Sequence, residues 1–113
     1  MFGIREIDIS GLEKMRSEGT IKLIDVRSEG EVARGYIAGA EHIPMHLIPL
    51  KVNELCADTP TVFYCQSGAR SGQVTAFLSQ QGFRNVMNLQ GGILAWVRAG
   101  QMLATPGLNF SLQ

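Results

Sequence analysis

The sequence has no excess of either charge and no long apolar run. Its 10 Lys and Arg residues balance 10 Asp and Glu residues, so the formal net charge is zero. No cluster of basic residues stands out, which argues against binding to nucleic acid or to an anionic membrane surface. The longest apolar region, residues 43–50, is interrupted by Pro44, His46 and Pro49, so it predicts no membrane span. We therefore expect neither nucleic acid nor a membrane among the partners.

Cysteine is scarce as well. The chain has only Cys56 and Cys65, and no Cys-x-x-Cys pair, which argues against a zinc site or a thioredoxin-like redox motif. A strand expected at 61–64 would hold the two cysteines farther apart than the roughly 7 Å between Cα atoms that a disulfide allows. We therefore expect no disulfide, and we expect Cys56 to be a packing residue at the end of a helix.

Signals for a metal site and for secretion are also missing. His42 and His46 are four residues apart, but Pro44 lies between them and argues against a shared helical face. We expect no metal and no other cofactor. Residues 1–6 carry charges where a signal peptide needs an apolar stretch, so we expect the protein to be cytoplasmic.

The patterning predicts a single α/β domain. The chain has 113 residues, of which 45% are hydrophobic and 18% charged, enough for a real core. Strands are expected at 4–9, 21–26, 40–43, 61–64 and 85–89. Helices are expected at 10–19, 28–34, 47–55, 72–81 and 93–98, the first two beginning with capping boxes at Ser10 and Ser28. This alternation predicts a mostly parallel five-stranded sheet flanked by helices on both faces.

The last residues are less regular. We expect the domain to span residues 1–100, followed by a C-terminal tail at 101–113. The tail contains apolar residues that should pack on the domain or on a partner, namely Met102, Leu103, Leu108 and Phe110.

The most informative stretch is 61–71, which reads Thr-Val-Phe-Tyr-Cys-Gln-Ser-Gly-Ala-Arg-Ser. Cys65 lies at the end of a predicted strand and before a predicted helix, so loop N–H groups and the helix dipole should converge on its sulfur. Arg70 adds a permanent positive charge. These conditions lower the pKa of a thiol and make it nucleophilic. The alternative is a buried structural cysteine, but the polar loop with Gly68 and Arg70 favours the nucleophile.

Other candidate site residues follow from the topology. Ligands of parallel sheets bind beyond the carboxyl ends of the strands, where Asp25 and Arg27 should support the site. We expect a structural ion pair here; the alternative is that Arg27 pairs with Glu31 at the edge of the site while Asp25 braces a neighbouring loop. The predicted site has Cys65 as its catalytic residue, and its substrate-binding residues are Gln66, Ser67, Gly68, Ala69, Arg70 and Ser71.

The length of the loop selects its ligand. Cysteine phosphatases hold a phosphate dianion between the cysteine and an arginine six positions later. Here Arg70 is the fifth residue after Cys65, so the loop is one residue short for that cradle. A tighter ring of N–H groups suits a smaller anion, such as the outer sulfur of a persulfide attached to the cysteine.

Four segments in order resemble the motifs of single-domain rhodaneses, a family of sulfurtransferases. They are Leu-Ile-Asp-Val-Arg at 23–27, Gly-Tyr-Ile-Ala-Gly-Ala-Glu-His-Ile-Pro at 35–44, the loop at 65–71, and Gly-Phe-Arg-Asn-Val at 82–86 with Leu-Gln-Gly-Gly at 89–92 and Trp96. One departure is Tyr36, which stands where the family signature usually has His. That position is usually structural in the family.

The resemblance implies a rhodanese-like fold and a two-step transfer through a Cys65 persulfide. The donor would be thiosulfate or another persulfide, and the acceptor cyanide in vitro or a sulfur-carrier protein in the cell. The neutral Gln66 stands where rhodaneses suited to thiosulfate often carry a basic residue, so the donor stays open. The alternatives are a noncatalytic rhodanese-like interaction module and, less favoured, a cysteine phosphatase or arsenate reductase.

Overall fold

The computed structural model describes residues 3–55 and 58–106. The expectations for Cys56, Leu108 and Phe110 concern residues outside these ranges. In chain order the elements are β1 (Glu6–Ile7), α1 (Ile9–Glu18), β2 (Lys22–Asp25), α2 (Glu29–Ala33), β3 (Glu41–His42), the 3-10 helix η1 (Met45–Glu54), β4 (Thr61–Tyr64), α3 (Ala69–Gln80), β5 (Val86–Leu89) and α4 (Gly92–Arg98).

The sheet formed by the described residues has five strands in the order β1-β5-β4-β2-β3, and every pair is parallel. The predicted α/β fold is thus confirmed. The central strand, β4, pairs with β2 so that Asp25 lies opposite Tyr64. Because both strands end at this register, the residues that follow them, including Cys65, emerge at the same edge of the sheet.

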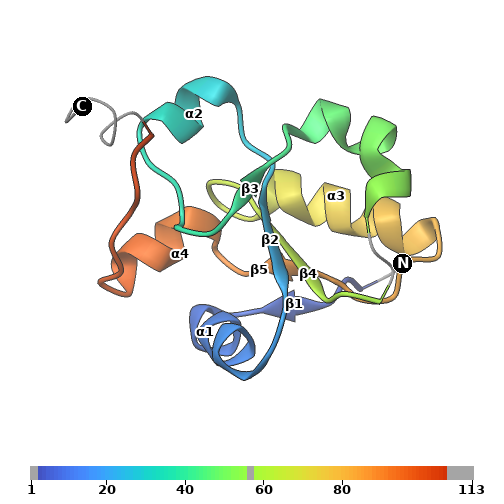
Figure 1. Cartoon of the computed structure of the whole chain (residues 1–113), viewed down its shortest axis with the longest axis horizontal. Helices are drawn as coiled ribbons and strands as arrows, with labels where there is room; N and C mark the ends of the chain where they lie inside the picture. Colours follow the sequence, from blue (N-terminus) through green and yellow to red (C-terminus); the bar gives the residue numbers. More distant parts are fainter. Residues whose placement is uncertain (1–2, 56–57, 107–113) are drawn as a thin grey trace.

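Helices cover both faces of this sheet (Figure 1). On one face, Ile48 of η1 and Val74 and Leu78 of α3 pack with Phe63 of β4 in one hydrophobic core. On the other, helices α1 and α4 supply Leu12, Ile93 and Trp96 to a second core with Val62 and Tyr64. Neighbouring residues of β4 thus point to opposite cores, as the two-residue period of a strand requires.

Two helices begin earlier than the sequence predicts. Helix α1 begins at Ile9, because the side chain of Asp8 accepts a hydrogen bond from the N–H of Gly11 at 2.8 Å and caps the helix; the predicted cap at Ser10 is wrong. Helix α3 begins at Ala69 instead of residue 72, because Gly68 adopts a left-handed conformation with φ 104° that few other residues tolerate. The capping box of Ser28 and Glu31 in α2 is confirmed.

The helix predicted at 47–55 is a 3-10 helix. Its first residues follow a three-residue spacing, since the N–H of Leu47 donates to the carbonyl of Pro44 at 2.8 Å. Pro49 has no N–H to donate within the helix, which removes one of the hydrogen bonds that an α-helix would need. Ile48 nevertheless reaches the core with only 1% of its surface exposed.

The described part of the tail lies against the domain. Ala104 forms an isolated antiparallel bridge with Tyr36, with both main-chain hydrogen bonds at 2.8 Å. The indole Nε1 of Trp96 donates to the carbonyl of Met102 at 3.0 Å. Since the bridge uses only main-chain groups of Tyr36, a side chain other than His is accommodated there without loss of these bonds.

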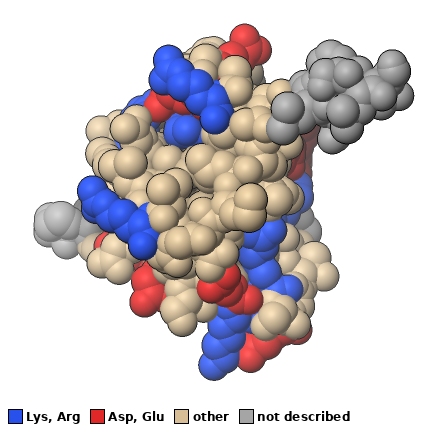
Figure 2. Space-filling view, turned by 90° about the vertical axis from the view of Figure 1, so that its left-hand side faces the viewer, with Lys and Arg blue, Asp and Glu red and all other residues tan. Residues whose placement is uncertain are grey.

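Charged side chains of both signs lie on the surface of the domain (Figure 2). On the face shown in Figure 2, basic and acidic residues lie scattered among uncharged ones, and the described residues form no continuous basic patch there. Within residues 3–55 and 58–106, no helix combines the length and the apolar character needed to cross a membrane.

Candidate active site

Cys65 directly follows β4 and is 1% exposed. Main-chain hydrogen bonds from the start of α4 hold the loop that begins at Cys65. The N–H of Ile93 donates to the carbonyl of Cys65 at 2.9 Å, and the N–H of Leu94 donates to the carbonyl of Gln66 at 3.1 Å. These bonds engage two loop carbonyls at the start of α4, where N–H groups have no partner within their own helix.

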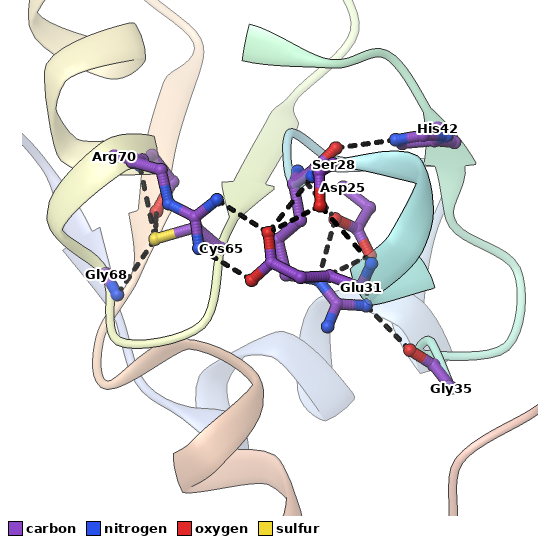
Figure 3. Close-up of polar contacts among 10 residues, drawn as sticks. Asp25, Ser28, Glu31, Gly35, His42, Cys65, Gly68 and Arg70 are labelled. Atoms are coloured by element: carbon purple, nitrogen blue, oxygen red, sulfur yellow. Dashed lines mark hydrogen bonds and ion pairs between the residues drawn. The ribbon is translucent and has the colours of Figure 1, made fainter. Parts of the chain in front are cut away.

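The sulfur of Cys65 receives hydrogen bonds from the following turn (Figure 3). The N–H of Gly68 lies 3.1 Å from it, and both the N–H and the hydroxyl of Ser71 lie at 3.4 Å. The expected convergence of loop N–H groups on the sulfur is thus present for Gly68 and Ser71. Ser71 belongs to the first turn of α3, so the positive end of that helix also lies beside the sulfur.

These contacts favour the thiolate. Burial alone would raise the pKa of the Cys65 thiol. Hydrogen bonds from the hydroxyl and N–H of Ser71 and from the N–H groups of Gly68 and Ser67 outweigh burial and lower the pKa below its ordinary value. Lowering the pKa increases the thiolate fraction near neutral pH, and the thiolate is the reactive form.

This electrostatic account predicts the pH dependence of alkylation. In a Cys56→Ser background, the rate of Cys65 alkylation by iodoacetamide should rise with pH and reach half its plateau below about 8.5, the pKa of an unperturbed cysteine. Ser71→Ala should move that midpoint upward, because the thiolate loses the hydroxyl donor. A midpoint at or above the ordinary value, or one that Ser71→Ala leaves in place, would contradict the account.

Arg70 is paired with a carboxylate beside the sulfur. Its two terminal nitrogens donate to the two oxygens of Glu31, each at 2.8 Å, and Figure 3 shows the guanidinium turned toward Glu31. The sequence predicts Arg70 as a cation that meets an anionic donor, but it does not predict this partner. The planar fork of arginine matches a carboxylate in this two-point geometry.

Glu31 is itself fixed by the start of α2. One of its oxygens accepts from the N–H of Ser28 at 3.1 Å and from the Ser28 hydroxyl at 3.0 Å. Hydrogen bonds from Arg70 have the largest effect on the pKa of Glu31 and lower it. Burial acts in the opposite direction, but with the further hydrogen bonds from Ser28 the pKa falls to about 2. The carboxylate therefore stays charged over the whole pH range in which a thiol can be studied.

The alternative pair between Arg27 and Glu31 is wrong. Arg27 instead binds Asp25, with Nε and a terminal nitrogen 2.8–3.1 Å from the carboxylate, and it donates to the carbonyl of Gly35 at 2.7 Å. Asp25 also accepts the main-chain N–H of Arg27 at 2.9 Å, so the short link along the chain favours this partner. The expected structural ion pair describes this geometry. Both side chains are buried, so losing one partner would cost about 3–5 kcal/mol.

Sequence reasoning missed Asn88, which is 2% exposed. Its amide nitrogen donates to Glu6 at 2.9 Å and to the carbonyl of Gly68 at 3.2 Å, and its oxygen accepts the hydroxyl of Ser71 at 2.5 Å. Asn88 thus ties β5 and β1 to the turn that surrounds the sulfur. The available signal was a polar side chain in the otherwise apolar strand Val86–Leu89, because a buried amide needs partners.

A cleft of about 930 Å³ adjoins Arg70. Arg70 and Ser28 form part of its wall. Its apolar wall consists of Val26, Pro44, Met45 and Leu47. The remaining predicted residues Gln66, Ser67 and Ala69 are exposed around the sulfur. Among the described residues, no group of three or more His, Cys, Asp or Glu side chains is arranged to hold a metal ion.

Comparisons with known proteins agree with this fold. The family model of the rhodanese-like domain matches residues 8–99. A protein of Allochromatium vinosum named sulfurtransferase is 43% identical over 104 residues, covering 91% of this chain and 97% of that protein. A protein of Pseudomonas entomophila named thiosulfate sulfurtransferase is 34% identical over 82 residues, covering 73% of this chain and 74% of that protein.

A solved structure has the same architecture. The crystal structure of a rhodanese-like domain protein from Staphylococcus aureus matches with a TM-score of 0.81 and 30% identity, covering 92% of this chain and all of that one. The chain belongs to the rhodanese-like family, and the predicted rhodanese-like fold is confirmed.

Proposed function

We propose that this protein is a sulfurtransferase that carries sulfur as a persulfide on Cys65. The observation that carries the proposal is the buried sulfur at the end of β4, hydrogen-bonded by Gly68 and Ser71 in a loop where Arg70 follows Cys65 by only five positions. Membership of the rhodanese-like family and relatives named sulfurtransferase support the same reaction.

In the first step the thiolate of Cys65 attacks the outer sulfur of thiosulfate or of another persulfide donor. A bond forms between the two sulfurs, the bond within the donor breaks, and sulfite or a thiolate leaves with the electron pair. N–H groups of residues 66–71 hold the resulting persulfide anion, and those in the first turn of α3 have no partners within the helix. The buried pair of Asp25 and Arg27 keeps the neighbouring loop in place.

In the second step an acceptor attacks the outer sulfur and Cys65 leaves as a thiolate. Cyanide would take the sulfur as thiocyanate in vitro, and the thiol of a sulfur-carrier protein would take it in the cell. We assign the protein to the cytoplasm, because a free thiol nucleophile persists in a reducing compartment. The reaction needs no metal or organic cofactor, since the cysteine provides both the nucleophile and the leaving group.

The proposal predicts sulfur transfer without phosphatase activity. The protein should form thiocyanate from thiosulfate and cyanide and should leave aryl phosphates intact. N–H groups that converge on a single sulfur are misplaced for the oxygens of a phosphoryl group, and each misplaced donor costs about 3 kcal/mol in the transition state. Thiocyanate and phosphate release can be measured on one preparation. Phosphate release that depends on Cys65 and exceeds sulfur transfer would overturn the proposal in favour of a phosphatase.

A further inference from the structure

The charged groups around Cys65 offer no excess of positive charge to bind a dianionic donor such as thiosulfate. Both nitrogens at the end of Arg70 are used by Glu31 at 2.8 Å, so the guanidinium is already neutralised by a carboxylate. The other arginine near the site, Arg27, is neutralised by Asp25 in the same way. With the thiolate of Cys65 added, these five groups carry one net negative charge. Thiosulfate, which carries two, would approach a site of like net charge and would compete with Glu31 for Arg70.

Glu31 is not free to move aside. It is held by the N–H and hydroxyl of Ser28 as well as by Arg70, and its side chain is 19% exposed. A capping box at the start of α2 therefore holds a negative charge against Arg70, which belongs to the loop of Cys65. Glu31 caps α2 with one carboxylate oxygen, whereas its second oxygen accepts a hydrogen bond from Arg70. Glu31 therefore does more than cap the helix.

The adjoining cleft is larger than thiosulfate, and apolar side chains form part of its wall beside charged and polar ones. Its volume is about 930 Å³, and Val26, Met45 and Leu47 contribute apolar wall beside Arg70. Thiosulfate has no apolar part to place against these side chains, whereas an organic thiol has one. The cleft therefore suits a donor whose sulfur is attached to an organic group.

We propose that Glu31 is a specificity-determining residue, which disfavours dianionic thiosulfate and favours organic persulfides of lower charge as the sulfur donors of Cys65. The inference rests on the proposed sulfur-transfer function and names the donor class for it. With an organic persulfide the thiolate of Cys65 attacks the outer sulfur, the thiolate of the donor leaves, and the sulfur stays on Cys65. The leaving group then carries one charge, where sulfite carries two.

The test compares two donors in three proteins. Loading of Cys65 is measured by intact mass over time with thiosulfate and with the persulfide of 2-mercaptoethanol, which bears no charge apart from its sulfur. Glu31→Gln keeps the size of the side chain and one acceptor for Arg70 but removes the charge. It should raise the rate with thiosulfate relative to the rate with the organic persulfide by about tenfold, as expected when a fixed like charge is removed a few ångströms from a dianion.

Glu13→Gln is the matched control, because it removes the same charge from an exposed position of α1 that does not line the cleft. It should change the ratio of the two rates far less than Glu31→Gln. Equal ratios in wild type and Glu31→Gln, or equal effects of the two variants, would overturn the role of Glu31 while leaving sulfur transfer intact. If neither donor loads wild-type Cys65, the sulfur-transfer function itself is overturned, and the inference with it.

Discussion

Cys65→Ser should reduce sulfur transfer from thiosulfate to cyanide to the rate of the uncatalysed reaction. A serine oxygen cannot form the chain of two sulfurs through which both steps pass, and at neutral pH its hydroxyl is not ionised. The N–H groups of the loop would then have no persulfide anion to stabilise. Thiocyanate formation at saturating donor measures the effect, and thermal unfolding checks that the variant is folded.

The matched control is Cys56→Ser, which removes the other cysteine of the chain. It should retain sulfur transfer, because the proposed reaction uses a single thiol. Transfer that survives in Cys65→Ser, or that disappears in Cys56→Ser, would contradict the assignment of the nucleophile.

Gly92→Ala should displace the loop of Cys65, although Gly92 itself lies outside that loop. A Cβ atom at Gly92 would lie 2.5 Å from the carbonyl oxygens of both Cys65 and Gln66, so the main chain of the loop would have to move. Gly92 also has φ 60°, a conformation that is costly for alanine. Because a displacement of about 1 Å in a catalytic group can lower the rate about 100-fold, we expect a loss of that order in sulfur transfer.

Gly100→Ala is the control that separates the two effects of Gly92→Ala, the clash with the loop and the backbone strain. Gly100 has φ 85° but no atom within 4 Å of the position of its Cβ, so the variant carries the conformational cost of about 1 kcal/mol alone. Chemical denaturation should show a larger loss of stability for Gly92→Ala, and only that variant should lose sulfur transfer. Equal activity in the two variants would show that the contact between α4 and the loop does not position Cys65.

Local patterns were sufficient for much of the fold and for the nucleophile. The apolar run at 61–64 followed by a glycine-bearing polar loop predicts both the strand and the place of Cys65, because a strand, a turn and a helix start each leave a signal within a few residues. The Ser28 capping box was predictable for the same reason. The start of α1 was not, because Asp8 and Ser10 can both cap a helix and only the course of the chain chooses between them.

The electrostatic partners in the site depend on tertiary contacts that the sequence does not encode locally. Arg70 and Glu31 are 39 residues apart, and Asn88 and Ser71 are 17 apart. Their pairing depends on the order of strands in the sheet and on which loops meet at its edge. The wrong pairing of Arg27 with Glu31 has the same origin, since two arginines and two carboxylates allow more than one arrangement until the geometry is known.

The central claim is that Cys65 holds the transferred sulfur, and intact mass spectrometry tests it most directly. After incubation with a sulfur donor and its removal, the wild-type protein should be heavier by one sulfur atom, and cyanide should restore the original mass. Cys56→Ser should gain and lose the same mass. A sulfur atom that still binds to Cys65→Ser, or a wild-type protein that turns over the donor without ever gaining that mass, would contradict the persulfide on Cys65.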